Sequence, residues 1–177
     1  SFINCYFEAV SGFTSTGFTV FDNIKQIDQS LILWRSTSQW VGGLYFLFSI
    51  LLLIDIFDEN LKKSITNYFS LNSSEIFKQS FKIIIIYTLL TLLIFILLKF
   101  INLRSFDSLN LSFTIISSGG FLPFNNLNPL FQSNVSKIIL SILMLTSYFS
   151  LFLIYNIIFL NKKNLNYLSE DFYLFIY

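Results

Sequence analysis

Residues 13–23 read Phe-Thr-Ser-Thr-Gly-Phe-Thr-Val-Phe-Asp-Asn, and residues 116–126 read Ile-Ser-Ser-Gly-Gly-Phe-Leu-Pro-Phe-Asn-Asn. Aligned on Gly17 and Gly120, both stretches carry three small residues, a glycine, two phenylalanines and a final pair of Asp or Asn residues. The copies lie 103 residues apart, and each follows a short apolar stretch and precedes a long one. Hydroxyl residues and glycine between apolar segments indicate backbone that enters a membrane to meet an ion.

The composition is that of a membrane protein. The chain is 54% hydrophobic and 12% charged, whereas soluble domains carry about 25% charged residues. A net charge of +1 argues against a nucleic-acid partner. The absence of histidine and the single cysteine exclude disulfides, Cys/His zinc sites and histidine-based catalysis. We therefore expect no enzyme and no cofactor. The sequence opens at Ser1 without a signal peptide, which is typical of a fragment.

Three apolar segments are candidates for membrane spans. Ser36–Ile54 is uncharged for 19 residues and Ile138–Leu160 for 23. Ile83–Leu98 is uncharged for only 16 residues, but Lys82 and Lys99 flank it and can reach toward the membrane surface. A span needs roughly 20 residues, so all three segments qualify as predicted spans.

Two further apolar stretches are too short to span a membrane. Ile3–Phe13 and Asp107–Ile116 each predict about three helical turns. Each runs directly into one copy of the repeated motif. A short helix, a glycine-containing loop and then a full span form the layout of a re-entrant pore loop, in which protein or a water-filled cavity surrounds the bare backbone.

The sequence thus predicts an all-α integral membrane protein built from repeated span–pore loop–span units, as in potassium channels. Residues 1–54 hold the pore helix, filter loop and second span of the first unit, and residues 55–78 form a cytoplasmic connector. Residues 79–160 form a complete second unit. Residues 161–177 hold another cytoplasmic connector and the start of a third unit.

The repeated motif suits a potassium ion. A ring of backbone carbonyls replaces the water around the ion without burying a formal charge, and glycine tolerates the dihedrals that point successive carbonyls inward. The neighbouring hydroxyls add oxygen ligands or brace the loop. Plain turns between helices are the alternative, which the two matching copies make less favourable. The candidate ion-binding residues are Thr14, Ser15, Thr16, Gly17, Ser117, Ser118, Gly119 and Gly120.

Glu8 and Arg35 are candidate supporting residues. A carboxylate at membrane depth is a functional candidate by default. Glu8 either attracts cations toward the loop or forms a structural ion pair with Arg35 behind it. Arg35, at the outer end of a predicted span, either extends to the membrane surface or braces the loop.

Four further residues follow the glycines of the two copies. Asp22 is expected at the outer mouth, where a negative rim concentrates cations, although it also suits a loop-capping role. Asn125 takes the same place in the second copy, so any such effect is asymmetric. Phe18 and Phe121 are the phenylalanines that directly follow the aligned glycines.

Three runs resemble a known family. Phe7 to Gly17, Phe-Glu-Ala-Val-Ser-Gly-Phe-Thr-Ser-Thr-Gly, resembles the first pore loop of the Trk/Ktr/HKT potassium transporters. Leu33 to Gly43, Leu-Trp-Arg-Ser-Thr-Ser-Gln-Trp-Val-Gly-Gly, is similar to the helix that follows this loop in bacterial Trk-type proteins. Ser112 to Phe121 resembles the second pore loop.

The resemblance implies four span–loop–span units around one pore in a single polypeptide. This chain would hold the end of the first unit, the whole second unit and the start of the third, without the third and fourth filter loops. It implies a multi-pass protein of the bacterial inner membrane that contacts lipid, forms a homodimer and binds a cytoplasmic nucleotide-binding regulatory subunit. The 55–78 connector is shorter than is usual for Trk proteins, which leaves contacts through that region open.

Potassium uptake is the function that the resemblance implies, with K⁺ as the transported ion. In this family a serine in place of the first filter glycine favours sodium, so Gly17 favours potassium. A Na⁺-dependent or Na⁺-conducting relative and a non-functional truncated membrane protein are the alternatives. An integral membrane enzyme would need converging polar groups, which the sequence does not offer.

Overall fold

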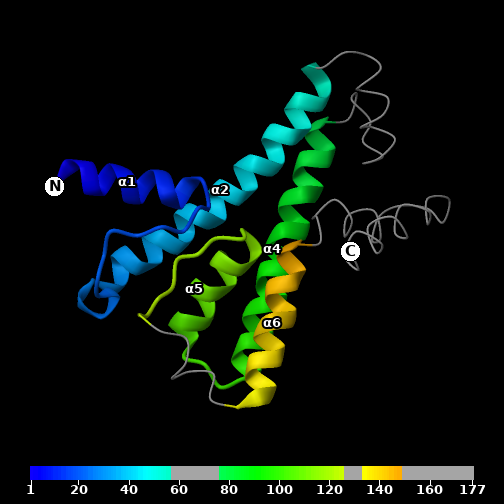
Figure 1. Ribbon diagram of the computed structural model, residues 1–177. Coiled ribbons are helices and arrows are strands. Elements are labelled where there is room, and N and C mark those ends of the chain that lie inside the picture. The colour runs from blue at the N-terminus through cyan, green and yellow to red at the C-terminus, as the bar shows by residue number, and fades with distance from the viewer. Residues whose placement is uncertain (57–75, 126–132, 149–177) are drawn as a thin grey trace, which may run out of the picture. The chain divides into compact units, whose positions relative to one another are not determined.

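The computed structural model describes residues 1–56, 76–125 and 133–148. Every regular element in these ranges is a helix, which confirms the all-α prediction there (Figure 1). Two compact units are present. The first, Ser1–Leu47 with Tyr87–Tyr148, carries both motifs up to residue 125. Of the second unit, residues 48–56 and 76–86 are described.

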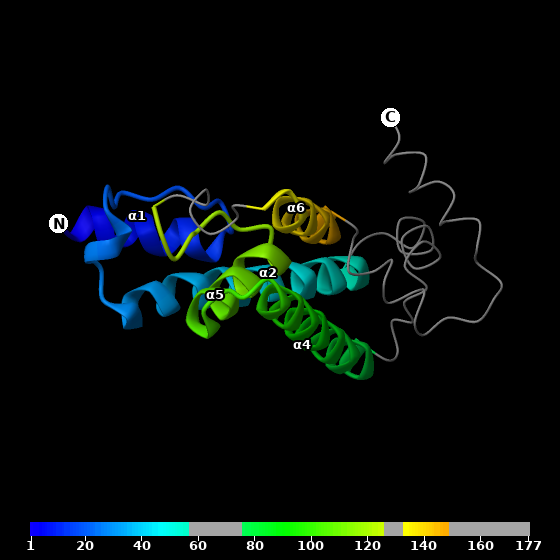
Figure 2. The same cartoon turned by 90° about the horizontal axis from the view of Figure 1, so that it is seen from below.

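Two short helices precede the motifs. Helix α1 spans Phe2–Phe13 and helix α5 spans Ser105–Ile116, and each has 12 residues. The short helices predicted at 3–13 and 107–116 are thus confirmed as elements. The Ser1 hydroxyl caps the start of α1 by accepting from the Asn4 N–H at 3.4 Å. Figures 1 and 2 show α1 and α5 both lying against the N-terminal half of helix α2.

Helix α2 spans Gln29–Ile56 and follows a short 3₁₀ helix, η1, at Ile24–Gln26. It begins one and a half to two turns before Ser36, where the sequence analysis placed the start of a span. The difference arises because Arg35 was treated as a boundary, whereas the helix continues through this residue. The predicted span Ser36–Ile54 ends in residues whose side chains lie outside the description, so its passage through a membrane stays a prediction.

Helix α4 spans Ile76–Phe100. Its segment Ser80–Phe100 is, among the described residues, the one stretch that is long and apolar enough to cross a membrane. This segment contains the predicted span Ile83–Leu98. The helix begins inside the predicted 55–78 connector, because charged residues end an apolar run without ending a helix. Residues 57–75 of that connector and all of 161–177 lie outside the described residues.

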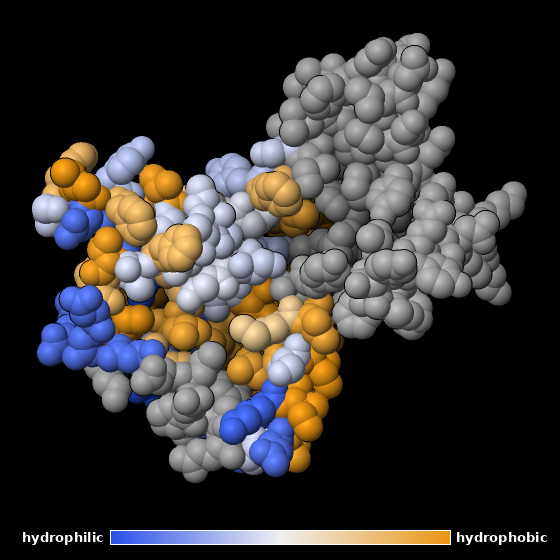
Figure 3. Space-filling model, in the orientation of Figure 1, coloured by the Kyte–Doolittle hydropathy of each residue, from blue (hydrophilic) through white to orange (hydrophobic). Residues whose placement is uncertain are grey.

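Helix α6 spans Asn134–Tyr148. The predicted span Ile138–Leu160 therefore starts within α6, and its residues from 149 onward lie outside the description. Apolar side chains gather on the exposed surface of this helix (Figure 3), among them Val135, Ile138 and Ile142. Such a surface suits contact with lipid or with another apolar segment.

Helix α2 is the element on which the first unit is assembled. Trp40 donates from Nε1 to the Thr91 hydroxyl at 3.0 Å, and its carbonyl oxygen accepts from the Tyr87 hydroxyl at 3.0 Å. Its ring also lies 5.1 Å from the ring of Tyr87 and 5.7 Å from that of Phe113 between centroids. Trp40 thus joins α2 to both α4 and α5.

Gly42 and Gly43 allow neighbouring segments to pack closely against α2. A Cβ atom on Gly43 would lie 2.7 Å from the Tyr87 hydroxyl and 3.0 Å from the Cβ of Ser117. A Cβ atom on Gly42 would lie 2.7 Å from the carbonyl carbon of Phe13 and closer still to its oxygen. The end of α1 therefore rests directly on the backbone of α2.

Replacing Gly42 by alanine is expected to destabilise the protein. Alanine is favoured over glycine in a helix by about 1 kcal/mol, so any loss of stability must come from the overlap with Phe13. An overlap of this kind costs about 1–3 kcal/mol. The melting temperature in detergent should fall. Phe46→Leu, at an exposed position of the same helix, is the control and should change stability by less than about 0.5 kcal/mol. An unchanged or higher melting temperature for Gly42→Ala would contradict the contact.

Candidate functional site

The first loop, residues 14–20, leaves α1 through a defined helix-ending motif. The Thr16 N–H donates to the Ser11 carbonyl at 3.1 Å, and the Ser15 N–H donates to the Gly12 carbonyl at 3.0 Å. Ser15 takes the left-handed conformation, with φ 53°. These two bonds and the left-handed residue define a Schellman motif. The chain therefore turns sharply at the end of α1.

The second loop, residues 117–123, leaves α5 in the same way. The Gly119 N–H donates to the Thr114 carbonyl at 2.8 Å, and the Ser118 N–H donates to the Ile115 carbonyl at 3.1 Å. Ser118 also has φ 53°. Each of these residues lies 103 positions after its counterpart in the first loop. The two copies therefore share backbone geometry as well as sequence.

The hydroxyl at the first position of each loop bonds back to its helix. Thr14 Oγ1 donates to the Val10 carbonyl at 2.7 Å, and Ser117 Oγ donates to the Phe113 carbonyl at 2.9 Å. These pairs again occupy equivalent positions. Of the two roles expected for the hydroxyls, the structure shows bracing for Thr14 and Ser117.

The two loops meet at their aligned glycines. Gly17 has φ +78°, and a Cβ atom on it would lie 2.5 Å from the backbone nitrogen of Gly120 and would overlap its Cα atom. A Cβ atom on Gly120 would lie 3.2 Å from the Cα of Gly17. The backbones thus touch with no side chain between them. Glycine is required at position 17 both by its dihedral and by this approach.

The phenylalanines that follow the two glycines differ in environment. Phe18 is 68% exposed, and its carbonyl oxygen accepts from the Ser11 hydroxyl at 2.6 Å. Phe121 is 2% exposed and lies close to Gly12 of α1 and Arg35 of α2. The motif repeat therefore has equivalent backbones at the helix ends but different side-chain packing after the glycines.

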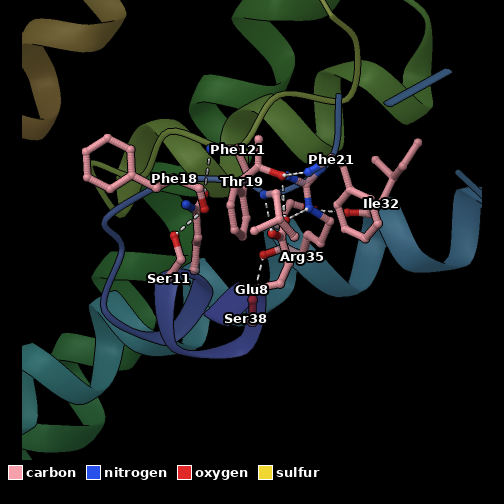
Figure 4. Close-up of polar contacts among 12 residues, drawn as sticks. Glu8, Ser11, Phe18, Thr19, Phe21, Ile32, Arg35, Ser38 and Phe121 are labelled. Atoms are coloured by element: carbon pink, nitrogen blue, oxygen red, sulfur yellow. Dashed lines mark hydrogen bonds and ion pairs between the residues drawn. The ribbon is translucent and has the colours of Figure 1, made fainter. Parts of the chain in front are cut away.

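Glu8 and Arg35 form a buried ion pair behind the first loop. Arg35 Nε lies 2.7 Å from Glu8 Oε1, and the residues are 1% and 3% exposed. Of the roles considered for Glu8, pairing with Arg35 is the one that the structure shows. Arg35 does not extend to the surface; it braces the loop from inside the fold (Figure 4).

The ion pair also holds both loops. Thr19 donates from Oγ1 to Glu8 Oε1 at 2.8 Å and accepts from Arg35 Nη2 at 3.0 Å. On the other side, the Cζ atom of Arg35 lies 4.1 Å from the centroid of the Phe121 ring, a cation–π distance. One guanidinium therefore contacts the first loop, the second loop and α1.

The ends of the loops are joined by amides. Asn125 accepts at Oδ1 from the Ile24 N–H at 2.7 Å and donates from Nδ2 to Asn23 Oδ1 at 2.9 Å. Asp22, the counterpart of Asn125 in the first copy, is exposed. The two positions therefore differ in the structure: Asn125 links the two copies, whereas Asp22 is exposed, and a cation-concentrating role for Asp22 stays a prediction.

Several predicted ion-binding residues are exposed at the surface of the two loops. Thr14, Thr16, Ser118 and Gly120 are exposed among the described residues. An open cleft of about 310 Å³ adjoins the second loop, with residues 118–120 on one wall and Leu140 and Met144 of α6 on the other. The cleft is thus lined by predicted residues of the second copy, one of which, Gly120, touches Gly17 of the first.

Some residues that build this region were missed by sequence reasoning. Gln39 and Ser36 of α2 and Asn110 of α5 are buried. The Ser36 hydroxyl donates to Asn110 Oδ1 and so ties α5 to α2. A signal was available, because Arg35, Ser36 and Gln39 recur at the spacing of one helical face. Ser36 and Gln39 were included in the predicted span Ser36–Ile54 without a role of their own.

Replacing Ser118 by glycine is expected to stabilise the protein. A non-glycine residue in the left-handed conformation costs on the order of 1 kcal/mol, and the exposed Ser118 has φ 53°. Ser141→Gly is the control, since the same change within helix α6 should lower stability by about 0.5 kcal/mol. Melting temperatures in detergent test both. A fall for Ser118→Gly as large as that for Ser141→Gly would show that the left-handed turn is absent.

Comparison with known proteins adds independent information. The chain is 34% identical over 129 residues to an uncharacterized cation transporter of Methanocaldococcus jannaschii, covering 68% of this chain and 26% of the relative. It is 25% identical over 150 residues to the Trk system potassium uptake protein TrkH of Salmonella typhimurium, covering 81% of this chain and 31% of that protein.

A third relative matches a shorter segment of the chain at higher sequence identity. The Trk system potassium uptake protein TrkI of Halomonas elongata is 43% identical over 44 residues, which are 25% of this chain and 9% of that protein. No family model matches the chain, and no solved structure matches it. The aligned parts span less than a third of each of these relatives. By these sequence relationships, the chain belongs to the Trk-type potassium transporter family.

Proposed function

We propose that the protein containing this chain takes up potassium ions across the bacterial inner membrane along a path lined by the two loops. The observation that carries the proposal is the meeting of Gly17 and Gly120 at the ends of two backbone motifs of equal geometry. Two loops of equal backbone geometry along one path present their carbonyl oxygens to an ion in the same way. The named functions of the relatives support potassium as the ion.

The ligands in this proposal are mainly backbone carbonyls. The hydroxyls of Thr14 and Ser117 already donate to their own helices, so they brace the loops. Carbonyl oxygens supply a field suited to a potassium ion without a buried formal charge. The proposed ion-binding residues are Thr14, Ser15, Thr16, Gly17, Ser117, Ser118, Gly119 and Gly120.

The short helices favour a cation at the loops. Helices α1 and α5 both end at their loop, and the C-terminal end of a helix carries a partial negative charge. No charged side chain is needed for this contribution. Glu8, in contrast, is neutralised by Arg35 and serves the structure of the loop.

The rest of the path belongs to a longer polypeptide in this proposal. The relatives are about three to four times as long as the segments that match them. We propose four span–loop–span units around one path, in a multi-pass protein that contacts lipid. A homodimer and a cytoplasmic nucleotide-binding regulatory subunit are part of the same proposal, on the family resemblance.

A Na⁺-dependent or Na⁺-conducting relative is the second candidate. The first relative is named only as a cation transporter, which accommodates either ion. Glycine at position 17 favours potassium by the family resemblance. The names of the relatives describe transporters, which agrees with a protein that is not an enzyme.

Growth and flux together test the function. The whole reading frame is expressed in a bacterium that lacks potassium uptake, and growth is followed at limiting potassium. Rubidium and sodium fluxes are measured in the same cells. We expect restored growth and a flux that favours rubidium. Membrane-inserted protein that carries neither ion would contradict the proposal and favour a non-functional product, whereas preferential sodium flux would favour the second candidate.

A further inference from the structure

Gln39 of α2 contacts both loops. Its backbone carbonyl accepts from the Ser15 hydroxyl of the first loop at 3.3 Å. Its side-chain Oε1 accepts from the Phe121 N–H, next to Gly120 of the second loop, at 3.3 Å. The residue is 0% exposed. The backbone of Gln39 thus holds the first loop and its buried side chain holds the second, so this residue relates the positions of the two loops as long as both bonds are kept.

The second loop lies directly against the Gln39 amide. A Cβ atom on Gly119 would lie 2.8 Å from Gln39 Nε2 and closer still to Cδ and Oε1. The loop thus approaches α2 as closely as its backbone allows. Since Gly17 and Gly120 also touch, the length of the Gln39 side chain sets where the second loop stands against the first.

The two halves of the Gln39 amide have different roles. Oε1 holds the Phe121 N–H, whereas Nε2 has no hydrogen-bond partner among the described residues. Arg35, one turn earlier on α2, likewise has an Nη1 atom without a partner in the described part of the chain. A carboxylate in place of the amide would therefore keep the acceptor and lose no bond seen among the described residues.

We propose that Gln39 is a positioning residue that sets the spacing of the two loops and thereby the preference for potassium over sodium. The inference rests on the proposed function and assigns a new residue to it. Selectivity of a carbonyl site depends on its size and on the number of oxygens that face the ion. A shift of the second loop changes both, without any contact between Gln39 and the ion.

Two substitutions that hardly change the size of the side chain distinguish the loss of the hydrogen-bond acceptor from a change in packing. Gln39→Met keeps the length of the side chain and removes Oε1, so the buried Phe121 N–H loses its acceptor. Gln39→Glu keeps an acceptor at the same place. Thr37→Val is the control on the same helix, because the Thr37 hydroxyl bonds only to the Leu33 carbonyl of its own helix in the described structure.

The protein expressed from its whole reading frame is reconstituted in lipid vesicles, and potassium and sodium fluxes are measured. We expect Gln39→Met to lower the potassium/sodium flux ratio about fivefold or more, because the second loop shifts and the carbonyl site changes its size. Gln39→Glu and Thr37→Val should keep the ratio within about twofold. An unchanged ratio for folded Gln39→Met, or an equal loss for Gln39→Glu, would overturn the role of Gln39 while leaving the proposed function intact.

Amide hydrogen exchange gives a readout that does not depend on transport. Exchange in the peptide that contains Phe121 should become faster in Gln39→Met and stay unchanged in Gln39→Glu. If the unmodified protein carries no potassium, the proposed function fails and the link to selectivity fails with it. If exchange at Phe121 is the same in all variants, the positioning role fails even where potassium transport is found.

Discussion

Replacing Gly17 by serine is expected to weaken the selection of potassium over sodium by about tenfold or more, an effect of one to two kcal/mol between the ions. Gly17 has φ +78° and contacts the backbone of Gly120. A serine side chain strains this dihedral and pushes the loops apart, and its hydroxyl offers the ion a different oxygen. Rubidium and sodium fluxes of the whole protein, compared at equal expression, measure the change.

Gly12→Ser is the matched control for this experiment. It introduces the same side chain five residues earlier, on α1, where a Cβ atom would lie 3.3 Å from the Cβ of Ser38 and closer to its hydroxyl. We expect less folded protein but unchanged selectivity in what remains. If Gly17→Ser leaves the flux ratio of normally expressed protein unaltered, the first loop does not select the ion.

Replacing Arg35 by methionine is expected to lower the free energy of unfolding by about 3–5 kcal/mol. The change leaves the Glu8 carboxylate buried without its cation and removes the bond to Thr19 and the contact with Phe121. Because native proteins are marginally stable, little folded protein should be recovered. Detergent-solubilised yield and melting temperature by fluorescence-detected gel filtration measure the loss.

Two controls assign this loss to the buried pair. Glu8→Gln combined with Arg35→Met removes both charges and should recover at least half of the lost stability, since no buried charge stays unpaired. Arg104→Met breaks the ion pair between Arg104 and Asp107, in which the Arg104 side chain is 61% exposed. This change should cost less than about 1 kcal/mol of stability. Equal effects of Arg35→Met and Arg104→Met would show that Arg35 is not buried in the protein.

The sequence was most informative where local chemistry decides the structure. The helices predicted at 3–13 and 107–116 are found at Phe2–Phe13 and Ser105–Ile116. The two copies of the motif predicted similar local structure, and both helices end in the same hydrogen-bonded turn. Such turns depend on neighbouring residues alone, so a short sequence repeat is sufficient to reveal them.

Sequence reasoning failed where contacts join distant segments. Arg35 was expected to brace the loop or to extend to the membrane surface, but Gln39 on the same face of α2 received no role, because periodicity does not say what a polar face contacts. The bond from Phe121 to Gln39 joins residues 82 positions apart. Phe18 and Phe121 take the same place in the two copies, yet Phe18 is exposed and Phe121 is buried, a difference that the repeated sequence does not reveal.

Membrane topology was predicted only in part. Helix α4 contains a segment, Ser80–Phe100, that is long and apolar enough to span. The expected spans at 36–54 and 138–160 extend into residues outside the described side chains, and so stay predictions. The polar, buried face near the N-terminal end of α2 shows why hydropathy alone places span boundaries poorly in a helix that also packs against protein.

The most direct measurement of the central claim is the position of a bound ion in an experimental structure of the whole protein. Crystals grown with thallium, which substitutes for potassium, give an anomalous signal at each ion. We expect a peak coordinated by carbonyl oxygens of residues 14–17 and 117–120, with Gly17 and Gly120 facing the same axis. A structure in which the ion lies elsewhere, or in which either glycine faces lipid, would contradict the account.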